Sequence, residues 1–283
     1  MVKMESRGGA SPKGIAAIVG VGPRLGRSIA RKFSQEGYTV AILARDLERL
    51  FRFAKEIARE AKAPVFAIRI DCSDSQSIRE AFESVLSLGF IEVLVYNAYQ
   101  QQQPVSFISS SSSSSSSVAN TISNSQLYPN RFIDARIDSF EKSLAVSTVG
   151  AFHCAQQVLP GMVDRKRGTI LFTGSSASLN GFPGFSELCC GKFALRALSQ
   201  CLAKEVQPLG VHVAHVIIDG IIGPPRSSSP SRSMVGAQQA AVTTLLMDPD
   251  ALAQTYWYLH VQDRNAWTHE IHLRSSNSND FNI

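Results

Sequence analysis

The sequence predicts one doubly wound α/β domain whose sheet has seven strands and is mostly parallel. Short apolar runs alternate with amphipathic segments along most of the chain, which is typical of βαβ units. The 283 residues, 44% of them hydrophobic, are enough for one large core. We therefore expect a single Rossmann-like domain over residues 15–274, with a flexible leader at 1–14 and a flexible tail at 275–283.

The first half of the chain contains four apolar runs, the first of which is residues 15–19. Leu25, Ile29 and Phe33 then recur every four residues, as on one buried face of a helix, and Gly37 ends that helix. Asp74 or Ser75 is expected to cap a later helix. The remaining predicted elements of this half are strands at 38–44, 65–70 and 91–96 and helices at 47–57 and about 75–89.

Composition changes abruptly between residues 99 and about 130. The stretch contains glutamines at 100–103 and nine consecutive serines at 109–117. Such a segment cannot bury enough apolar surface to order itself. We interpret it as a flexible insertion at the carboxyl end of the fourth strand, and we hypothesise that it screens access to a pocket there.

Regular structure is expected to resume after the insertion. Residues 211–218 are almost entirely apolar, as in a central parallel strand, and a second Ser/Pro-rich stretch follows at 224–233. The other predicted elements are helices at 137–162, 187–206 and 248–259 and strands at 169–173 and 268–273.

Several functional classes are disfavoured by composition. Net charge is +5, but no run of Lys and Arg is flanked by stacking aromatics, so no nucleic-acid partner is expected. No apolar stretch reaches the ~20 residues that span a bilayer, and the five cysteines form no CxxC pair. No metal site is expected, since His269 and His272 would face opposite sides of a strand. We expect a cytoplasmic protein with no membrane partner.

A glycine-rich turn joins the first strand to the first helix, with Gly20, Gly22 and Gly26 around Arg24. Such a turn lets a pyrophosphate approach the helix N-terminus, although alone it is a weak signal. Arg45 ends the next strand, where an acidic residue would bind a ribose 2′-hydroxyl and an arginine would bind a 2′-phosphate. Together these positions predict a site for NADP(H) in preference to NAD.

Further residues resemble the short-chain dehydrogenase/reductase family over nearly the whole chain outside the insertion. The resemblance rests on Asp71 after the third strand, on Asn97 and Ala98 after the fourth, on the 168–175 strand ending in Ser175, and on Lys192. It implies that Ser175 and Lys192 are catalytic. It also implies a cofactor site made by Gly20, Gly22, Arg24, Leu25, Gly26, Arg45, Asp71, Asn97, Ala98, Lys192 and Ile222.

The chain departs from the family pattern at four places. Arg24 replaces a glycine of the nucleotide turn, Ser147 replaces an asparagine, and Asp219-Gly220 replaces Pro-Gly. The family's tyrosine, expected four residues before Lys192, is Leu188. Because residues 188 and 192 share a helix face, Leu188 is expected to point into the pocket, where it cannot donate a proton.

Three interpretations remain open at this point. The protein is an NADP-dependent oxidoreductase acting on a carbonyl or alcohol of a small molecule, with Ser175, a water, Tyr99 or Tyr128 as proton donor. Alternatively, it binds the dinucleotide without turnover as a regulatory module, or its pocket holds nothing. By the same resemblance, helices 137–162 and 187–206 could form a homo-oligomer interface. An apolar substrate lining is expected from Leu179, Phe182, Phe185 and Phe193.

Overall fold

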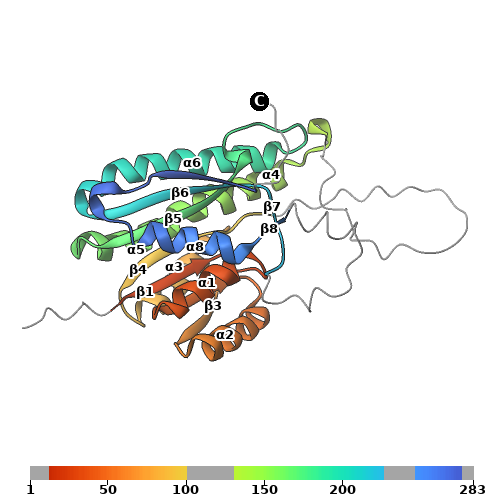
Figure 1. Ribbon diagram of the computed structural model, residues 1–283. Helices are drawn as coiled ribbons and strands as arrows, with labels where there is room; N and C mark the ends of the chain where they lie inside the picture. The colour runs from red at the N-terminus through yellow and green to blue at the C-terminus, as the bar shows by residue number, and fades with distance from the viewer. Residues whose placement is uncertain (1–12, 101–130, 226–245, 276–283) are drawn as a thin grey trace, which may run out of the picture.

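The computed structural model describes residues 13–100, 131–225 and 246–275 (Figure 1). Most of the predicted leader, tail and Ser/Gln-rich insertion lies outside the described residues, as does most of the 224–233 stretch. Within the described ranges, no helix combines the length and apolar character needed to cross a membrane.

A seven-stranded, fully parallel sheet forms the centre of the molecule, which confirms the predicted fold class. The strand order is β3-β2-β1-β4-β5-β6-β9, so the chain starts mid-sheet, winds outward, returns and winds to the other edge (Figure 1). The strands are β1 (Ile15–Val19), β2 (Thr39–Ala44), β3 (Val65–Arg69), β4 (Ile91–Tyr96), β5 (Gly168–Ser175), β6 (Val211–Asp219) and β9 (Glu270–Arg274).

Helices cover both faces of the sheet, and each face has its own apolar core. Side chains of β1 alternate between the two, Ala17 on one side and Ile18 on the other. One core contains α1 (Leu25–Gln35), α2 (Leu47–Ala61) and α8 (Pro249–His260); the other contains α3 (Ser75–Leu86), α5 (Gly150–Asp164) and α6 (Ser186–Val206). Asp74 caps α3 and Asp248 caps α8, each accepting a backbone N–H two residues ahead.

The predicted helix 137–162 differs from expectation in its middle. It consists of α4 (Ile137–Leu144), a π-helical turn η2 (Ala145–Val149) and α5. Ser147 lies fully buried in that turn, against Gly191 of α6, where an added Cβ would approach the Ser147 Cβ to 2.9 Å. The wide turn thus occurs where two small residues bring helices into close contact, a feature that apolar periodicity cannot reveal.

A two-stranded ribbon, β7 (Ile221–Ile222) with β8 (Leu246–Met247), was not predicted. Two-residue strands are too short to produce a period-two pattern.

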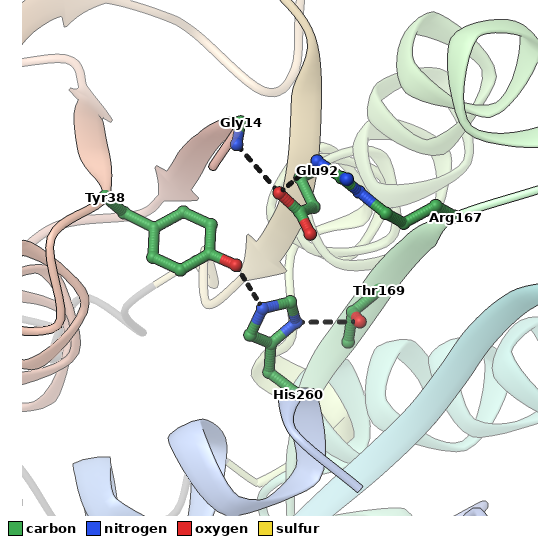
Figure 2. Close-up of polar contacts among 6 residues, drawn as sticks. All are labelled: Gly14, Tyr38, Glu92, Arg167, Thr169 and His260. Carbon is green, nitrogen blue, oxygen red and sulfur yellow. Dashed lines mark hydrogen bonds and ion pairs between the residues drawn. The ribbon is translucent and has the colours of Figure 1, made fainter. Parts of the chain in front are cut away.

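A buried polar cluster closes the amino edge of the sheet (Figure 2). Glu92 accepts hydrogen bonds from the Gly14 amide at 2.7 Å and from Arg167 at 3.0 Å. Beside it, the Tyr38 hydroxyl contacts the His260 Nε2 at 2.6 Å, and the His260 Nδ1 contacts the Thr169 Oγ1 at 2.9 Å. Through His260, this amino-edge cluster ties the end of α8 to the amino ends of the strands.

Candidate functional site

Two adjoining hollows lie at the carboxyl edge of the sheet, where the winding direction reverses between β1 and β4. Their volumes are about 250 and 540 Å³, and they share Gly20, Gly22, Pro23, Arg49, Asn97 and Tyr99. The first extends over the ends of β2 and β3, and the second over the end of β5 and the start of α6. Ligands of open α/β sheets bind at such a switch point. We call the two together the cleft, with an outer and an inner half respectively.

The three glycines of the turn after β1 have different structural roles. Gly20 has a φ of +84°, and a Cβ there would lie 2.6 Å from the Ala98 Cα, so only glycine permits β1 and β4 to end so close together. A Cβ on Gly26 would lie 2.9 Å from the Val21 Cα. A Cβ on Gly22 would meet nothing within 4 Å, because Gly22 faces the open cleft.

The amino end of α1 points at the same turn. Arg24 occupies the N-cap position without a side-chain cap, and no acidic residue lies in the first turn. The first amides of the helix therefore have no internal carbonyl partner, and the partial positive charge of the helix end is not offset locally. This arrangement favours a phosphate beside Gly22.

Positive charge gathers around the outer half of the cleft. Arg45 follows β2 and is exposed, while Arg49, one helical turn later, lines both halves. Burial would raise the pKa of the Asp71 carboxyl, but hydrogen bonds from the amide and hydroxyl of Ser73, at 2.9 and 2.7 Å, and the charge of Arg45 hold it below its usual value. Asp71 is thus an ionised acceptor at the far end of the outer half.

Asn97 fixes the shape of the cleft. Its side-chain amide donates to the Gly20 carbonyl at 2.9 Å, and its backbone amide donates to the Val19 carbonyl at the same distance. These bonds fasten the end of β4 to the glycine turn. Ala98 follows and is buried, with its backbone close against Gly20.

The inner half contains both predicted catalytic residues. Lys192 is 5% exposed, and its ammonium donates to the Thr173 carbonyl at 2.7 Å. Burial lowers the pKa of Lys192 to about 8. Ser175 ends β5, and its backbone amide donates a hydrogen bond to the Ser178 Oγ at 3.2 Å. Leu188 lines the same half, one turn before Lys192.

All the predicted cofactor residues line one half of the cleft or both. Arg24, Leu25, Gly26, Lys192 and Ile222 line the inner half, and Arg45, Asp71 and Ala98 the outer half.

The sequence reasoning missed Arg49, whose only signal was its spacing of four residues from Arg45. The expected apolar lining from Leu179, Phe182, Phe185 and Phe193 is wrong, since none of the four lines the cleft and Phe182 and Phe193 are exposed. The apolar side chains of the inner half belong to Leu188, Ile218 and Ile222 instead. The part of the chain described here fits a dinucleotide: an open face at Gly22, an uncapped helix end and a carboxylate at the distal end.

The family model described as short chain dehydrogenase matches residues 14–228. A 3-ketodihydrosphingosine reductase of Bos taurus is 23% identical over 253 residues, covering 86% of this chain and 67% of that protein. A very-long-chain 3-oxoacyl-CoA reductase of Ajellomyces capsulatus is 26% identical over 203 residues, covering 71% of this chain and 53% of that protein.

Solved structures share the fold. A short-chain dehydrogenase from Rhodopseudomonas palustris has a TM-score of 0.71 and 26% identity, covering 93% of this chain and 99% of that one. An alcohol dehydrogenase from Thermococcus sibiricus, complexed with 5-hydroxy-NADP, has a TM-score of 0.73 and 22% identity, covering 95% of this chain and 99% of that one.

Proposed function

The chain belongs to the short chain dehydrogenase family, and from that premise we propose that it is an NADP(H)-dependent oxidoreductase acting on a carbonyl or alcohol of a small molecule. One observation carries the proposal. The outer half with Arg45 and the inner half with Ser175 and Lys192 adjoin at the glycine turn, which lines both, and this arrangement suits a dinucleotide lying across the turn. The Thermococcus sibiricus structure with 5-hydroxy-NADP supports the choice of cofactor by analogy.

Each end of the cleft has a distinct role in this proposal. The amides at the start of α1 and the Gly22 backbone hold the pyrophosphate, and Asp71 receives the adenine amino group. Lys192 holds the nicotinamide ribose, and Ser175 polarises the substrate oxygen. When bound, NADPH supplies a hydride to the carbonyl carbon. Apolar Leu188, Ile218 and Ile222 exclude water from the reacting centre.

Arg45 gives the preference for NADP over NAD. Arg45 lines the outer half, where its charge helps to lower the pKa of Asp71, and Arg49 adds a second positive charge there. We assign the 2′-phosphate of the adenosine ribose to these two arginines. Guanidinium–phosphate pairs are directional and charge-assisted, worth about 1.5–3 kcal/mol for a hydrogen bond to a charged group. The preference is therefore expected to be ~10- to 100-fold in Kd.

Titration with NADPH and NADH, followed by nicotinamide fluorescence, tests this assignment. The wild type should bind NADPH more tightly, and Arg45→Asp should lose that preference. Arg52→Asp, an exposed charge reversal on α2 away from the cleft lining, is the matched control and should leave it intact. Tighter binding of NADH by the wild type, or an unchanged preference in Arg45→Asp, would refute the assignment.

A second function, a binding module without turnover, is favoured by one specific observation. Leu188 occupies the cleft wall one turn before Lys192, and Ser147 replaces a second polar family residue. A panel of carbonyls and alcohols, assayed for the wild type and Leu188→Tyr, separates the two. Turnover by the mutant alone identifies a binding module, whereas turnover by the wild type identifies an enzyme with another donor.

The panel should begin with 3-oxo compounds carrying long alkyl chains. The names of the two curated relatives both specify a 3-keto or 3-oxo group, one on a dihydrosphingosine and one on a very-long-chain acyl-CoA. The apolar side chains of Leu188, Ile218 and Ile222 in the inner half suit an alkyl chain. Reduction of short polar ketones in preference to these would contradict this choice.

We also propose that the two long helices form a homo-oligomer interface. Val149 and Phe152 of the 137–162 segment are about half exposed, and so is Phe193 of α6, which leaves apolar surface on both helices. Light scattering of the wild type beside Phe152→Glu tests this. A monomeric wild type would contradict it.

A further inference from the structure

The proposed reduction needs a proton donor that position 188 does not supply. Five of the six tyrosines are described, and only Tyr99 lines the cleft. The other four described tyrosines are placed elsewhere: Tyr38 in the amino-edge cluster, Tyr96 donating to the Val146 carbonyl, Tyr256 paired with the Thr173 Oγ1 at 2.8 Å, and Tyr258 exposed on α8.

Tyr99 lines the cleft from the end of β4. It follows Asn97 and Ala98 at the end of β4, and it lines both halves of the cleft. Its ring centroid lies 6.0 Å from the Lys192 ammonium, within the range of a cation–π contact. Tyr99 is 55% exposed, and it lines the inner half together with Ser175 and Leu188.

We propose that Tyr99, held over Lys192 from the β4 side, donates the proton that the family pattern would assign to position 188. The inference rests on the proposed function. In the reduction, the carbonyl carbon of the substrate gains a hydride from NADPH, which is oxidised to NADP⁺. The C=O π pair moves to oxygen, which takes the proton of the Tyr99 hydroxyl, and an alcohol forms.

Lys192 completes the cycle. The phenolate left on Tyr99 is stabilised by the nearby ammonium and regains a proton from it or from solvent through the open side of the cleft. Burial lowers the pKa of Lys192 to about 8, so the ammonium is charged at neutral pH and yet releases its proton more readily than a solvated lysine. Lys192 therefore serves Tyr99 as a positioning and proton-returning residue.

Tyr99→Phe is the direct test because it keeps the ring over Lys192 and removes only the hydroxyl. We expect kcat to fall ~10²- to 10⁴-fold while the Kd for NADPH stays within about twofold. Tyr258→Phe, equally exposed at 58% but on α8, is the matched control and should change neither value. Adding Leu188→Tyr to Tyr99→Phe should recover turnover, since the hydroxyl returns beside Lys192 from the helix.

Nitration gives a readout that needs no turnover. Tetranitromethane should nitrate both Tyr99 and Tyr258 in the free protein, and saturating NADP⁺ should protect Tyr99 alone, as mapped by mass spectrometry. Equal nitration of Tyr99 with and without bound NADP⁺, or undiminished kcat in Tyr99→Phe, would overturn the proposal. So would a wild type that binds NADPH but reduces nothing that Leu188→Tyr reduces. Failure to bind NADPH at all would instead refute the proposed function.

Discussion

Replacing Gly22 by valine should abolish tight dinucleotide binding without weakening the fold. At several glycines of the described residues an added side chain would clash with a neighbour, as a Cβ on Gly20 would with the backbone of Ala98. Gly22 is different, because its Cβ direction is open and its φ lies outside the left-handed region. Valine there fits the free protein but fills the space beside the amides that open α1.

The expected magnitudes follow from that geometry. A substitution at this half-buried position that makes no clash should change the free energy of unfolding by about 0.5 kcal/mol or less, a shift in Tm within about 2 °C. Displacing the pyrophosphate from even one or two amides removes charge-assisted hydrogen bonds of about 1.5–3 kcal/mol each, so the Kd for NADPH should rise at least tenfold. Gly20→Ala should instead lower the Tm, because it meets the Ala98 backbone and requires a positive φ.

The assay pairs nicotinamide fluorescence with thermal unfolding of the same samples. Gly181→Val is the control, since a Cβ there also meets nothing within 4 Å but the residue does not line the cleft. Gly22→Val should weaken binding and Gly181→Val should not, with similar Tm values for both. Unchanged NADPH affinity in Gly22→Val would refute the assignment of the pyrophosphate to this turn.

Three further predictions concern buried charge. Lys192→Met should raise the free energy of unfolding at pH 7 by up to about 3 kcal/mol, because the pKa of Lys192 is about 8 in the folded state and 10.5 in the unfolded state. This gain in stability should vanish near pH 10.5, and chemical denaturation at both pH values checks it. Burial lowers the pKa of His215 and His260 from 6.5 to about 4, so the stability that each neutral imidazole contributes is fully present above pH 6.5 and is lost as the pH falls to 4. The Tm should therefore decline progressively from pH 6.5 to pH 4. Glu92→Gln should lower stability by about 1–3 kcal/mol and leave NADPH affinity unchanged, since the amino-edge cluster lies across the sheet from the cleft; an altered Kd would contradict the separation of the two edges.

Sequence patterns predicted the elements that make up the sheet and its helices because their apolar residues repeat at regular intervals. The strands end within about two residues of expectation, and the cap at Asp74 follows from its side-chain chemistry. The π-helical turn at Ala145–Val149 was not predicted, since it depends on contact between Ser147 and Gly191, 44 positions apart.

The cleft was predicted better than its surroundings because its residues follow strands whose carboxyl ends meet at one edge. Gly20 and Arg45 could be grouped on that basis. Asp71 was added only by the family resemblance. The sequence offered Tyr99 as one possible proton donor, but it could not predict the contact between Tyr99 and Lys192, since no local pattern links β4 to α6. The amino-edge cluster carried no signal at all, because its members are scattered from Gly14 to His260.

A crystal structure of the protein with NADP⁺ would test the central claim most directly, through the distance from the 2′-phosphate oxygens to the Arg45 guanidinium. We predict hydrogen-bond contact at about 2.7–3.2 Å, with the pyrophosphate beside Gly22 and the nicotinamide ribose beside Lys192. A dinucleotide bound outside the cleft, or one whose 2′-phosphate touches neither Arg45 nor Arg49, would contradict the account.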